Sequence, residues 1–346
     1  MRRTGRSSSL LVLLSVLVVL VGCSASAAVR PMARNDAPGL AARIDAFLDD
    51  GGSSRHDRVR AVIVDVRGER RYVRGTPGSR GAARSVTKSV MATLIGIAID
   101  RGEIGGVEQT LAELLPDLAP TMPEAVRSAT LRQVLTMTAG IATDDALAAH
   151  GPTPADDWAA HALTLPPQGP PGDRFAYSTA GSHLLSAVLT EATGRSALDY
   201  AHEVLFGPLG FAAPTWDADP QGRQKGGTGL ALTAEEMLAI GRLYLAGGTW
   251  DGERVVSAEW ITAATSAHVG TGGRQLPGYG YQWWVGTAGG HPAFAAAGFG
   301  GQLIEVVPDL DLVVVVRTDV TNGPGAPPND YAGMVDAVIV PALSPR

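Results

Sequence analysis

Ser85 and Lys88 lie three residues apart in the stretch GAARSVTKSVMATLIGIAIDRGEI, residues 81–104, and both are residue types that can carry nucleophilic chemistry. Helix positions i and i+3 share a face, so the hydroxyl and the amine can reach each other. A serine hydroxyl is a weak nucleophile until a neighbouring base takes its proton. A lysine can be that base only where burial and nearby positive charge lower its pKa from about 10.4, whereas a guanidinium keeps its proton.

The scarcity of lysine supports this interpretation. The chain has 26 arginines but only two lysines, Lys88 and Lys225. A chain that uses arginine wherever it needs positive charge has a lysine where loss of a proton would matter. The alternative, a surface lysine that follows a serine by chance, stays open at this point because S-x-x-K alone is a weak motif.

Tyr177 is a third candidate. It follows a Pro/Gly-rich turn and precedes a helical pattern in PPGDRFAYSTAGSHLLSAVL, so its phenol is expected on a loop at an element boundary. Close to a lysine ammonium, a phenol has a pKa below its usual value of about 10, which suits a general base or proton shuttle. Taken alone, Tyr177 would be interpreted as a packing residue beside a turn.

The elements that must position these residues are strands at both ends of the chain and helices between them. The hydrophobic pattern predicts a hairpin over 58–75 that turns at Arg67-Gly68-Glu69, and a buried amphipathic helix from Ser85 to about Arg101. Thr233 and Glu236 form a predicted capping box at the start of another helix. Further strand patterns occupy 279–285, 302–307 and 312–318. We therefore expect an α/β (α+β) fold, in which N- and C-terminal segments build one antiparallel sheet flanked by helices, with an inserted helical subdomain.

The N-terminus has the pattern of an export signal. Three arginines within the first six residues precede an apolar run from Leu10 to Val21, which is short for a permanent membrane span. Residues 1–22 are therefore predicted to be a signal peptide. Cys23 is the only cysteine and follows Leu20-Val21-Gly22, a sequence that resembles the bacterial lipobox. We expect Cys23 to carry membrane lipid and to anchor the protein on the outer face of a membrane of the bacterial cell envelope; without lipidation it would be secreted.

The rest of the chain divides by composition. Residues 23–39 are rich in Ala, Ser, Pro and Arg and are expected to be a tether. Residues 40–346 would form the folded domain, with an α/β part at about 40–104 and 226–346 and a helical insertion at about 105–225.

Taken together, the segments resemble the serine β-lactamase and penicillin-binding-protein superfamily, in particular its class C-like branch, which also contains esterases and amide hydrolases. Ser85-Val86-Thr87-Lys88 matches the S-x-x-K motif, and Tyr177-Ser178-Thr179 matches Y-x-N with threonine in place of asparagine. Intervening blocks of the family follow in the family's order at 130–141, 170–194, 207–211 and 226–248. The resemblance extends from about residue 45 to residue 342.

The resemblance implies roles for these residues. Ser85 would be the nucleophile, Lys88 its activator, Tyr177 a general base and Thr179 a substrate contact. The third family motif, Lys-Thr-Gly or His-x-Gly, corresponds to Ala296-Ala297-Gly298 followed by Phe299, so its cation is absent. Gly298 would still let a strand edge approach the substrate closely. By the same analogy, the backbone N–H groups of Ser85 and Phe299 would form an oxyanion hole.

The expected activity is that of a serine hydrolase that cleaves a small-molecule ester or amide through an acyl-enzyme on Ser85, without a metal or organic cofactor. A D,D-peptidase and a β-lactamase are alternatives within the family. An alternative of another class is a non-catalytic lipoprotein that binds or senses cell-wall fragments. Retention of Ser85, Lys88 and Tyr177 argues against that last alternative.

Other classes lack support in the sequence. G-x-S-x-G and H-E-x-x-H are absent, and the seven histidines have no metal-ligand spacing, so His183 and His202 are interpreted as surface or packing residues. The formal net charge is −6 and no basic face stands out, so nucleic-acid binding is not expected. In the strand pattern around Trp283-Trp284, alternation predicts one ring inward and one outward.

Overall fold

Two strands near the N-terminus form the predicted hairpin. The computed structural model describes residues 39–49, 56–143, 157–273, 275–320 and 331–343. Strands β1 (Val59–Val66) and β2 (Glu69–Gly75) pair antiparallel. The turn residues Arg67 and Gly68 both have positive φ, 56° and 77°. Such a two-residue turn matches the right-handed twist of the strands it joins, so the hairpin prediction is confirmed.

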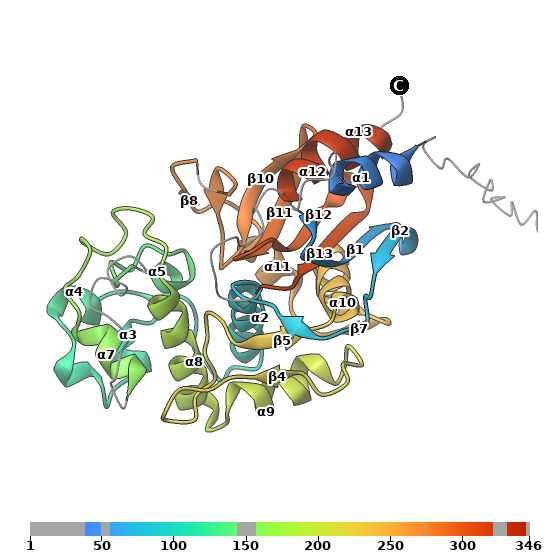
Figure 1. The fold of residues 1–346 in the computed structure, drawn as a ribbon. Coiled ribbons are helices and arrows are strands. Elements are labelled where there is room, and N and C mark those ends of the chain that lie inside the picture. Colours follow the sequence, from blue (N-terminus) through green and yellow to red (C-terminus); the bar gives the residue numbers. More distant parts are fainter. Residues whose placement is uncertain (1–38, 50–55, 144–156, 274, 321–330, 344–346) are drawn as a thin grey trace, which may run out of the picture. The chain divides into compact units, whose positions relative to one another are not determined.

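The central sheet joins both ends of the chain. Strand β1 pairs with β13, and the sheet runs in the order β2-β1-β13-β12-β11-β10-β9-β8 with every pair antiparallel (Figure 1). Its C-terminal strands are β8 (Val269–Gly270), β9 (Gly278–Tyr279), β10 (Trp284–Ala288), β11 (His291–Gly298), β12 (Gln302–Val307) and β13 (Leu312–Thr318). The predicted sheet built from N- and C-terminal segments is confirmed.

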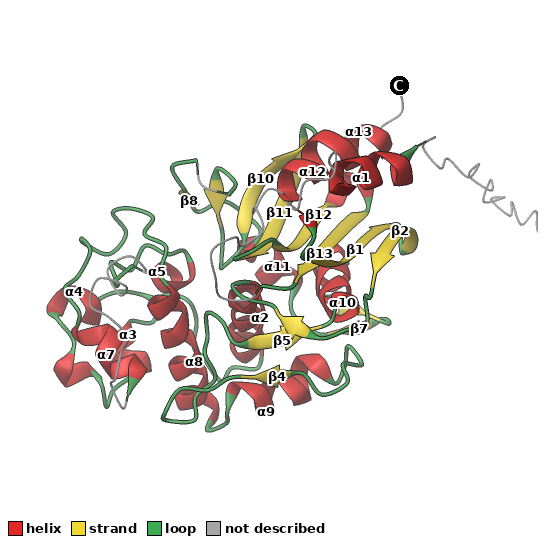
Figure 2. Ribbon diagram, in the orientation of Figure 1, coloured by secondary structure: helices red, strands yellow, loops and turns green. Residues whose placement is uncertain are grey.

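Helices cover both faces of this sheet, as Figure 2 shows. Along β13, Val313 and Val315 join one apolar cluster, whereas Val314 and Val316 join another. The first cluster includes α2 (Val86–Asp100) and α10 (Ala234–Leu245). The second includes α1 (Leu40–Asp49), α12 (Tyr331–Met334), the π-helical turn η6 (Val335–Ile339) and α13 (Val340–Leu343). A strand covered on both faces needs an apolar run rather than alternation, which is the pattern of LVVVVRT.

The segment between α2 and α10 is mainly helical, as predicted. It contains α3 (Leu111–Leu114), η3 (Ala119–Thr121), α4 (Glu124–Arg127), α5 (Leu131–Leu135), α7 (Trp158–Thr164), α8 (Thr179–Thr193), α9 (Ala197–Ala201) and the π-helical turn η4 (His202–Phe206). A small sheet joins β3 (Gly81–Ala82), β5 (Leu230–Leu232) and β4 (Thr215–Trp216).

The remaining elements follow α10, whose predicted capping box between Thr233 and Glu236 is present. They are the two-stranded ribbon β6 (Thr249–Trp250) and β7 (Glu253–Arg254), the helix α11 (Ala258–Ala264) and the turn η5 (Pro308–Leu310) between β12 and β13.

Helix α2 is buried, as predicted, but its burial extends beyond the one apolar face that the sequence indicated. Every residue from Val86 to Ala98 is buried, so the helix has no solvent face over this length. A Cβ added at Gly96 would lie 2.4 Å from the indole of Trp260, which shows how closely α11 approaches. Helix α2 is therefore enclosed by other elements from Val86 to Ala98.

Trp283 and Trp284 are both core residues, although the expected alternation would leave one ring outward. Trp283 is 0% exposed and Trp284 is 8% exposed, so neither ring points into solvent. Alternation still separates the two rings, because Trp283 belongs to the cluster around α2 and Trp284 to the cluster on the other face. A sheet covered on both faces buries both.

The N-terminal predictions concern residues 1–38, so the signal peptide, Cys23 and nearly all of the tether lie outside the described residues. None of the helices in the described ranges combines the length and the apolar character needed to cross a membrane.

Candidate active site

Ser85 lies at the junction between β3 and α2. It is the N-cap residue of α2, and the preceding residue, Arg84, has φ of 51°, a left-handed conformation that few residues other than glycine adopt. The Arg84 guanidinium donates to the backbone oxygen of Val320 at 2.8 Å, and the backbone N–H of Ala83 donates to Leu230 O at 2.8 Å. The chain is thus fixed immediately before Ser85, at the positive end of the α2 dipole.

Lys88 lies one turn further along α2 and is only 1% exposed. Its Nζ lies 3.3 Å from Ser85 Oγ, 3.0 Å from Thr179 Oγ1 and 2.9 Å from the backbone oxygen of Gly227. The three acceptors come from α2, from α8 and from the loop before β5. Because a lysine ammonium has three N–H donors, these contacts orient the whole group. In its neutral form, the same nitrogen can accept the proton of the Ser85 hydroxyl.

Tyr177 lies beside this lysine, with its ring centroid 5.0 Å from Lys88 Nζ. It immediately precedes Ser178, the N-cap of α8, whose Oγ accepts from the backbone N–H of Gly181 at 2.9 Å. Met137 fixes the chain on both sides of the tyrosine. Its backbone oxygen accepts from Ala176 N at 2.8 Å, and its sulfur accepts from Ser178 N at 3.3 Å. The predicted loop position at an element boundary is confirmed.

Aromatic side chains surround the Tyr177 ring. It stacks on Trp284 of β10 with centroids 5.8 Å apart and an interplanar angle of 18°. Phe175 and Tyr279 contact the same tryptophan, and burial raises the pKa of the Tyr279 phenol well above its usual range. Tyr279 is thus a neutral packing group at neutral pH, and these contacts fix the Tyr177 ring.

Strand β11 ends against the start of α2. A Cβ on Gly298 would lie 3.0 Å from Ser85 N and 2.8 Å from Ala83 O, so only glycine allows this approach. The next residue, Phe299, is 54% exposed, and the strand end therefore opens toward solvent. Ala296, where the third motif would have its cation, is buried in the apolar cluster around α2. The structure thus brings Ser85, Lys88, Tyr177, Thr179 and Gly298 together.

A family model described as "Beta-lactamase" matches residues 38–339. The chain belongs to this family. It is 27% identical over 272 residues to "Penicillin-binding protein 4" of Amycolatopsis lactamdurans. This match covers 68% of this chain and 71% of the relative. It is also 27% identical over 269 residues to "6-aminohexanoate-dimer hydrolase" of Paenarthrobacter ureafaciens. This match covers 69% of this chain and 66% of that relative.

A solved structure shows the same fold. The octameric penicillin-binding protein homologue of Pyrococcus abyssi has a TM-score of 0.70 and 18% identity, and the match covers 87% of this chain and 77% of that chain. The family match and the two relatives identify the protein as a serine hydrolase of the β-lactamase family.

Sequence reasoning missed Gln282, which ties the elements of this β-lactamase-family site together. Its backbone oxygen accepts from Ser89 Oγ at 2.7 Å, and its Oε1 accepts from Ser182 Oγ at 2.8 Å. Its Nε2 donates to the backbone oxygen of Leu135 at 2.8 Å. Gln282 thus fixes α2 next to Lys88, α8 near Thr179, and α5. Its only sequence signal is a polar residue inside an aromatic strand pattern.

Gly227 and His183 are the other residues that sequence reasoning missed. Gly227 contributes a backbone oxygen, which any residue type has, so nothing singled it out within the block at 226–248. His183 was interpreted as a surface or packing residue, but it is 6% exposed and makes polar contacts that approach the site. The residues of the described ranges contain no cluster of three or more His, Cys, Asp or Glu that could hold a metal ion.

Proposed function

We propose that this protein hydrolyses an ester or amide through an acyl-enzyme on Ser85. The observation that carries the proposal is the 3.3 Å contact between Ser85 Oγ and a lysine that is 1% exposed. A buried amine within reach of a serine hydroxyl can act as its base, because no bulk water competes for the proton.

In the acylation step, Ser85 Oγ attacks the substrate carbonyl carbon while its proton passes to Lys88 Nζ, directly or through the Tyr177 phenol. The bond to the leaving alcohol or amine then breaks, and that group takes the proton. In deacylation, water attacks the acyl ester, gives its proton to the same base and releases the acid. Ser85 regains its proton from that base, so no cofactor is consumed.

The negative charge that develops on the carbonyl oxygen needs fixed donors. We assign this role to the backbone N–H groups of Ser85 and Phe299. The close approach of Gly298 to Ser85 N supports the assignment, because it places the end of β11 beside the nucleophile. Main-chain donors fixed in this way stabilise a tetrahedral intermediate whether or not the strand has a cation.

The substrate class follows from two departures from the family pattern. Ala296 occupies the position of the usual cation, so a substrate carboxylate would lack a charge-assisted hydrogen bond there. Thr179 offers one hydroxyl, which already accepts from Lys88, where an asparagine would offer a carbonyl and two N–H donors. We therefore expect neutral short-chain esters to be cleaved best, neutral amides next and β-lactams least.

The test combines covalent labelling with a substrate panel. A fluorophosphonate probe should add its mass to the peptide that contains Ser85, and p-nitrophenyl esters should give higher kcat/KM than a chromogenic cephalosporin. Absence of both labelling and turnover would favour a binding or sensor protein. A cephalosporin that is turned over better than every ester would overturn the substrate assignment and direct the search to another cation, such as Arg274, which lies outside the described residues.

A further inference from the structure

The backbone oxygen that contacts Lys88 belongs to a tight turn, Lys225-Gly226-Gly227-Thr228. The backbone N–H of Thr228 donates to Lys225 O at 3.4 Å, and Gly227 O accepts from Lys88 Nζ at 2.9 Å. A Cβ on Gly227 would lie 3.0 Å from Lys88 Nζ, and one on Gly226 would lie 2.1 Å from Ser182 O. The turn therefore packs closely against both Lys88 and helix α8, with no room for a side chain at either glycine.

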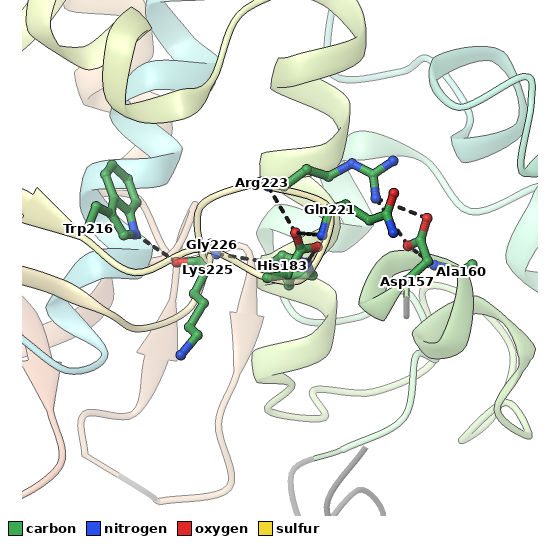
Figure 3. A network of polar contacts seen from close by, with 9 residues as sticks. Asp157, Ala160, His183, Trp216, Gln221, Arg223, Lys225 and Gly226 are labelled. Atoms are coloured by element: carbon green, nitrogen blue, oxygen red, sulfur yellow. Dashed lines mark hydrogen bonds and ion pairs between the residues drawn. The ribbon is translucent and has the colours of Figure 1, made fainter. Parts of the chain in front are cut away.

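Two side chains hold this turn from opposite sides. The Trp216 indole donates to Lys225 O at 2.9 Å (Figure 3) and to Thr228 O at 3.2 Å, so it fixes both ends of the turn. The backbone N–H of Gly226 donates to His183 Nδ1 at 3.4 Å. His183 lies on α8 four residues after Thr179, which itself contacts Lys88. Helix α8 thus reaches the lysine directly and also through the turn.

His183 is in turn oriented by Asp219. Its Nε2 lies 3.0 Å from Asp219 Oδ2, and both residues are 6% exposed. The other carboxylate oxygen, Oδ1, accepts from the backbone N–H groups of Gln221 and Arg223, both at 2.9 Å. With the carboxylate accepting at Nε2–H, the imidazole presents the lone pair of Nδ1 to Gly226. Figure 3 shows His183 beside the turn, with a dashed line joining it to Gly226.

We propose that His183 and Asp219 are positioning residues for Lys88: together they fix the turn that directs Gly227 O at the lysine nitrogen. The inference rests on the proposed function, in which Lys88 is the base. The carbonyl is one of the groups that orient Nζ, so a displaced turn should allow the lysine nitrogen to shift away from Ser85 Oγ. Displacement of a catalytic group by about 1 Å costs as much as a hundredfold in rate.

The contact between Gly226 N–H and His183 Nδ1 requires a neutral imidazole. If Nδ1 were protonated, two hydrogen-bond donors would face each other. The groups around His183 are Asp219, Asp157 of the α7 N-cap and Arg223, and Lys225 lies over the Trp158 ring that contacts the histidine. Burial lowers the pKa of His183 below 6.5, although Asp219 acts against this shift. A lowered pKa means that the folded state holds the neutral form down to a lower pH than the unfolded chain. The stabilisation is therefore present above pH 6.5 and is lost as the pH falls through the folded-state pKa.

The experiment measures the rate at which the fluorophosphonate probe labels Ser85, as a function of pH, in the full-length protein. His183→Ala should slow labelling at pH 7.5 by roughly ten- to a hundredfold and should lower kcat far more than it changes KM. Asp219→Asn should slow labelling although His183 is intact, because an amide nitrogen would face either the imidazole N–H or the two backbone N–H groups. His183→Asn places an amide oxygen near the position of Nδ1 and should recover part of the rate.

Leu189→Ala is the matched control, because Leu189 is fully buried on the same helix, six residues after His183, and its side chain has no polar atom. Rates are compared after correction for the folded fraction, measured by circular dichroism at each pH. The proposal also requires that the labelling rate fall less steeply at low pH in His183→Asn than in wild type, because the variant lacks the protonation of His183. The inference is overturned if His183→Ala or Asp219→Asn labels no more slowly than Leu189→Ala. If the wild-type protein does not label at all, the proposed function is wrong.

Discussion

The side-chain nitrogen of Lys88 lies 3.3 Å from the hydroxyl oxygen of Ser85, and it also contacts Thr179 Oγ1 and the backbone oxygen of Gly227. Each partner of the lysine thus comes from a different segment. The nitrogen is directed at the serine because the other two contacts leave it little freedom.

Lys88→Arg is the sharpest test of proton transfer. Arginine keeps the positive charge but does not give up its proton, so activity should fall nearly as far as in Lys88→Ala, by about a hundredfold or more. Ser85→Ala should abolish covalent labelling altogether. Mass spectrometry of the labelled protein and kcat/KM for a p-nitrophenyl ester measure both effects.

Lys225→Arg is the matched control, because Lys225 is the only other lysine and its side chain pairs with Asp217 at 3.5 Å near the surface. It should retain wild-type labelling. Substantial activity in Lys88→Arg would show that the lysine acts through its charge alone.

Gly298→Ala should weaken oxyanion stabilisation. The new methyl group would lie 2.8 Å from Ala83 O and 3.0 Å from Ser85 N, so the end of β11 must move away from the nucleophile. Loss of one oxyanion donor costs about a hundred- to a thousandfold in kcat, and partial displacement should cost at least about tenfold. The measurement is kcat for ester hydrolysis beside the thermal midpoint.

Gly333→Ala provides the comparison for this glycine, because a Cβ there meets no atom within 4 Å and the residue lies in helix α12. It should leave kcat unchanged and raise stability by up to about 1 kcal/mol. Equal kcat values in Gly298→Ala and Gly333→Ala would show that the end of β11 does not contribute to the oxyanion hole.

Glu305 should make the protein less stable as the pH rises. Its side chain is buried on β12, and among the described residues no hydrogen-bond partner reaches its Oε2. Burial, with Asp336 adding to it, raises the pKa of Glu305 to about 8 from 4.5. Between these values the folded state holds a proton that the unfolded state has released, so stability falls with pH by up to about 1.4 kcal/mol per pH unit.

Chemical denaturation of wild type and Glu305→Gln at several pH values tests this. The difference in unfolding free energy between the two should grow in favour of the glutamine variant from pH 5 to pH 8. Asp336→Asn serves as a control and should change the slope much less, since burial is the larger cause. Parallel curves for wild type and Glu305→Gln would mean that the carboxyl does not titrate in this range.

Cys23→Ser should release the protein from the membrane. A lipoprotein carries several acyl chains, which hold a membrane far more firmly than one chain, whereas serine in a lipobox accepts none. Expression in a bacterial host, followed by membrane fractionation and labelling of Ser85, gives the distribution. Ser26→Ala should stay with the membrane fraction as wild type does; identical partitioning of all three proteins would disprove the anchor.

The sequence determined those features that depend on neighbours along the chain. Ser85 and Lys88 share a helix face because the backbone repeats every 3.6 residues, and the hairpin at Arg67-Gly68 follows from local backbone preferences. The apolar strands at both ends implied one sheet, since each had to bury its side chains against another element. Thr179 became a candidate only through the family resemblance, and the resemblance strengthened the case for Tyr177, because a tyrosine before a helix has many ordinary uses.

Only the tertiary structure decided which distant groups meet the lysine. Gly227 lies 139 residues from Lys88 along the chain, and Gln282 lies 100 residues from Ser182. Backbone carbonyls and single polar side chains have no periodicity, so nothing in the residue types announces such contacts. Helix α2 illustrates the same limit: its pattern showed one apolar face, but the packing of α8, α11 and β11 around it buries every side. The identity of a side chain limits what it can bind, whereas its surroundings in the fold decide what it does bind. His183 is therefore an unremarkable histidine in the sequence, but in the structure it is buried between Asp219 and the backbone of Gly226.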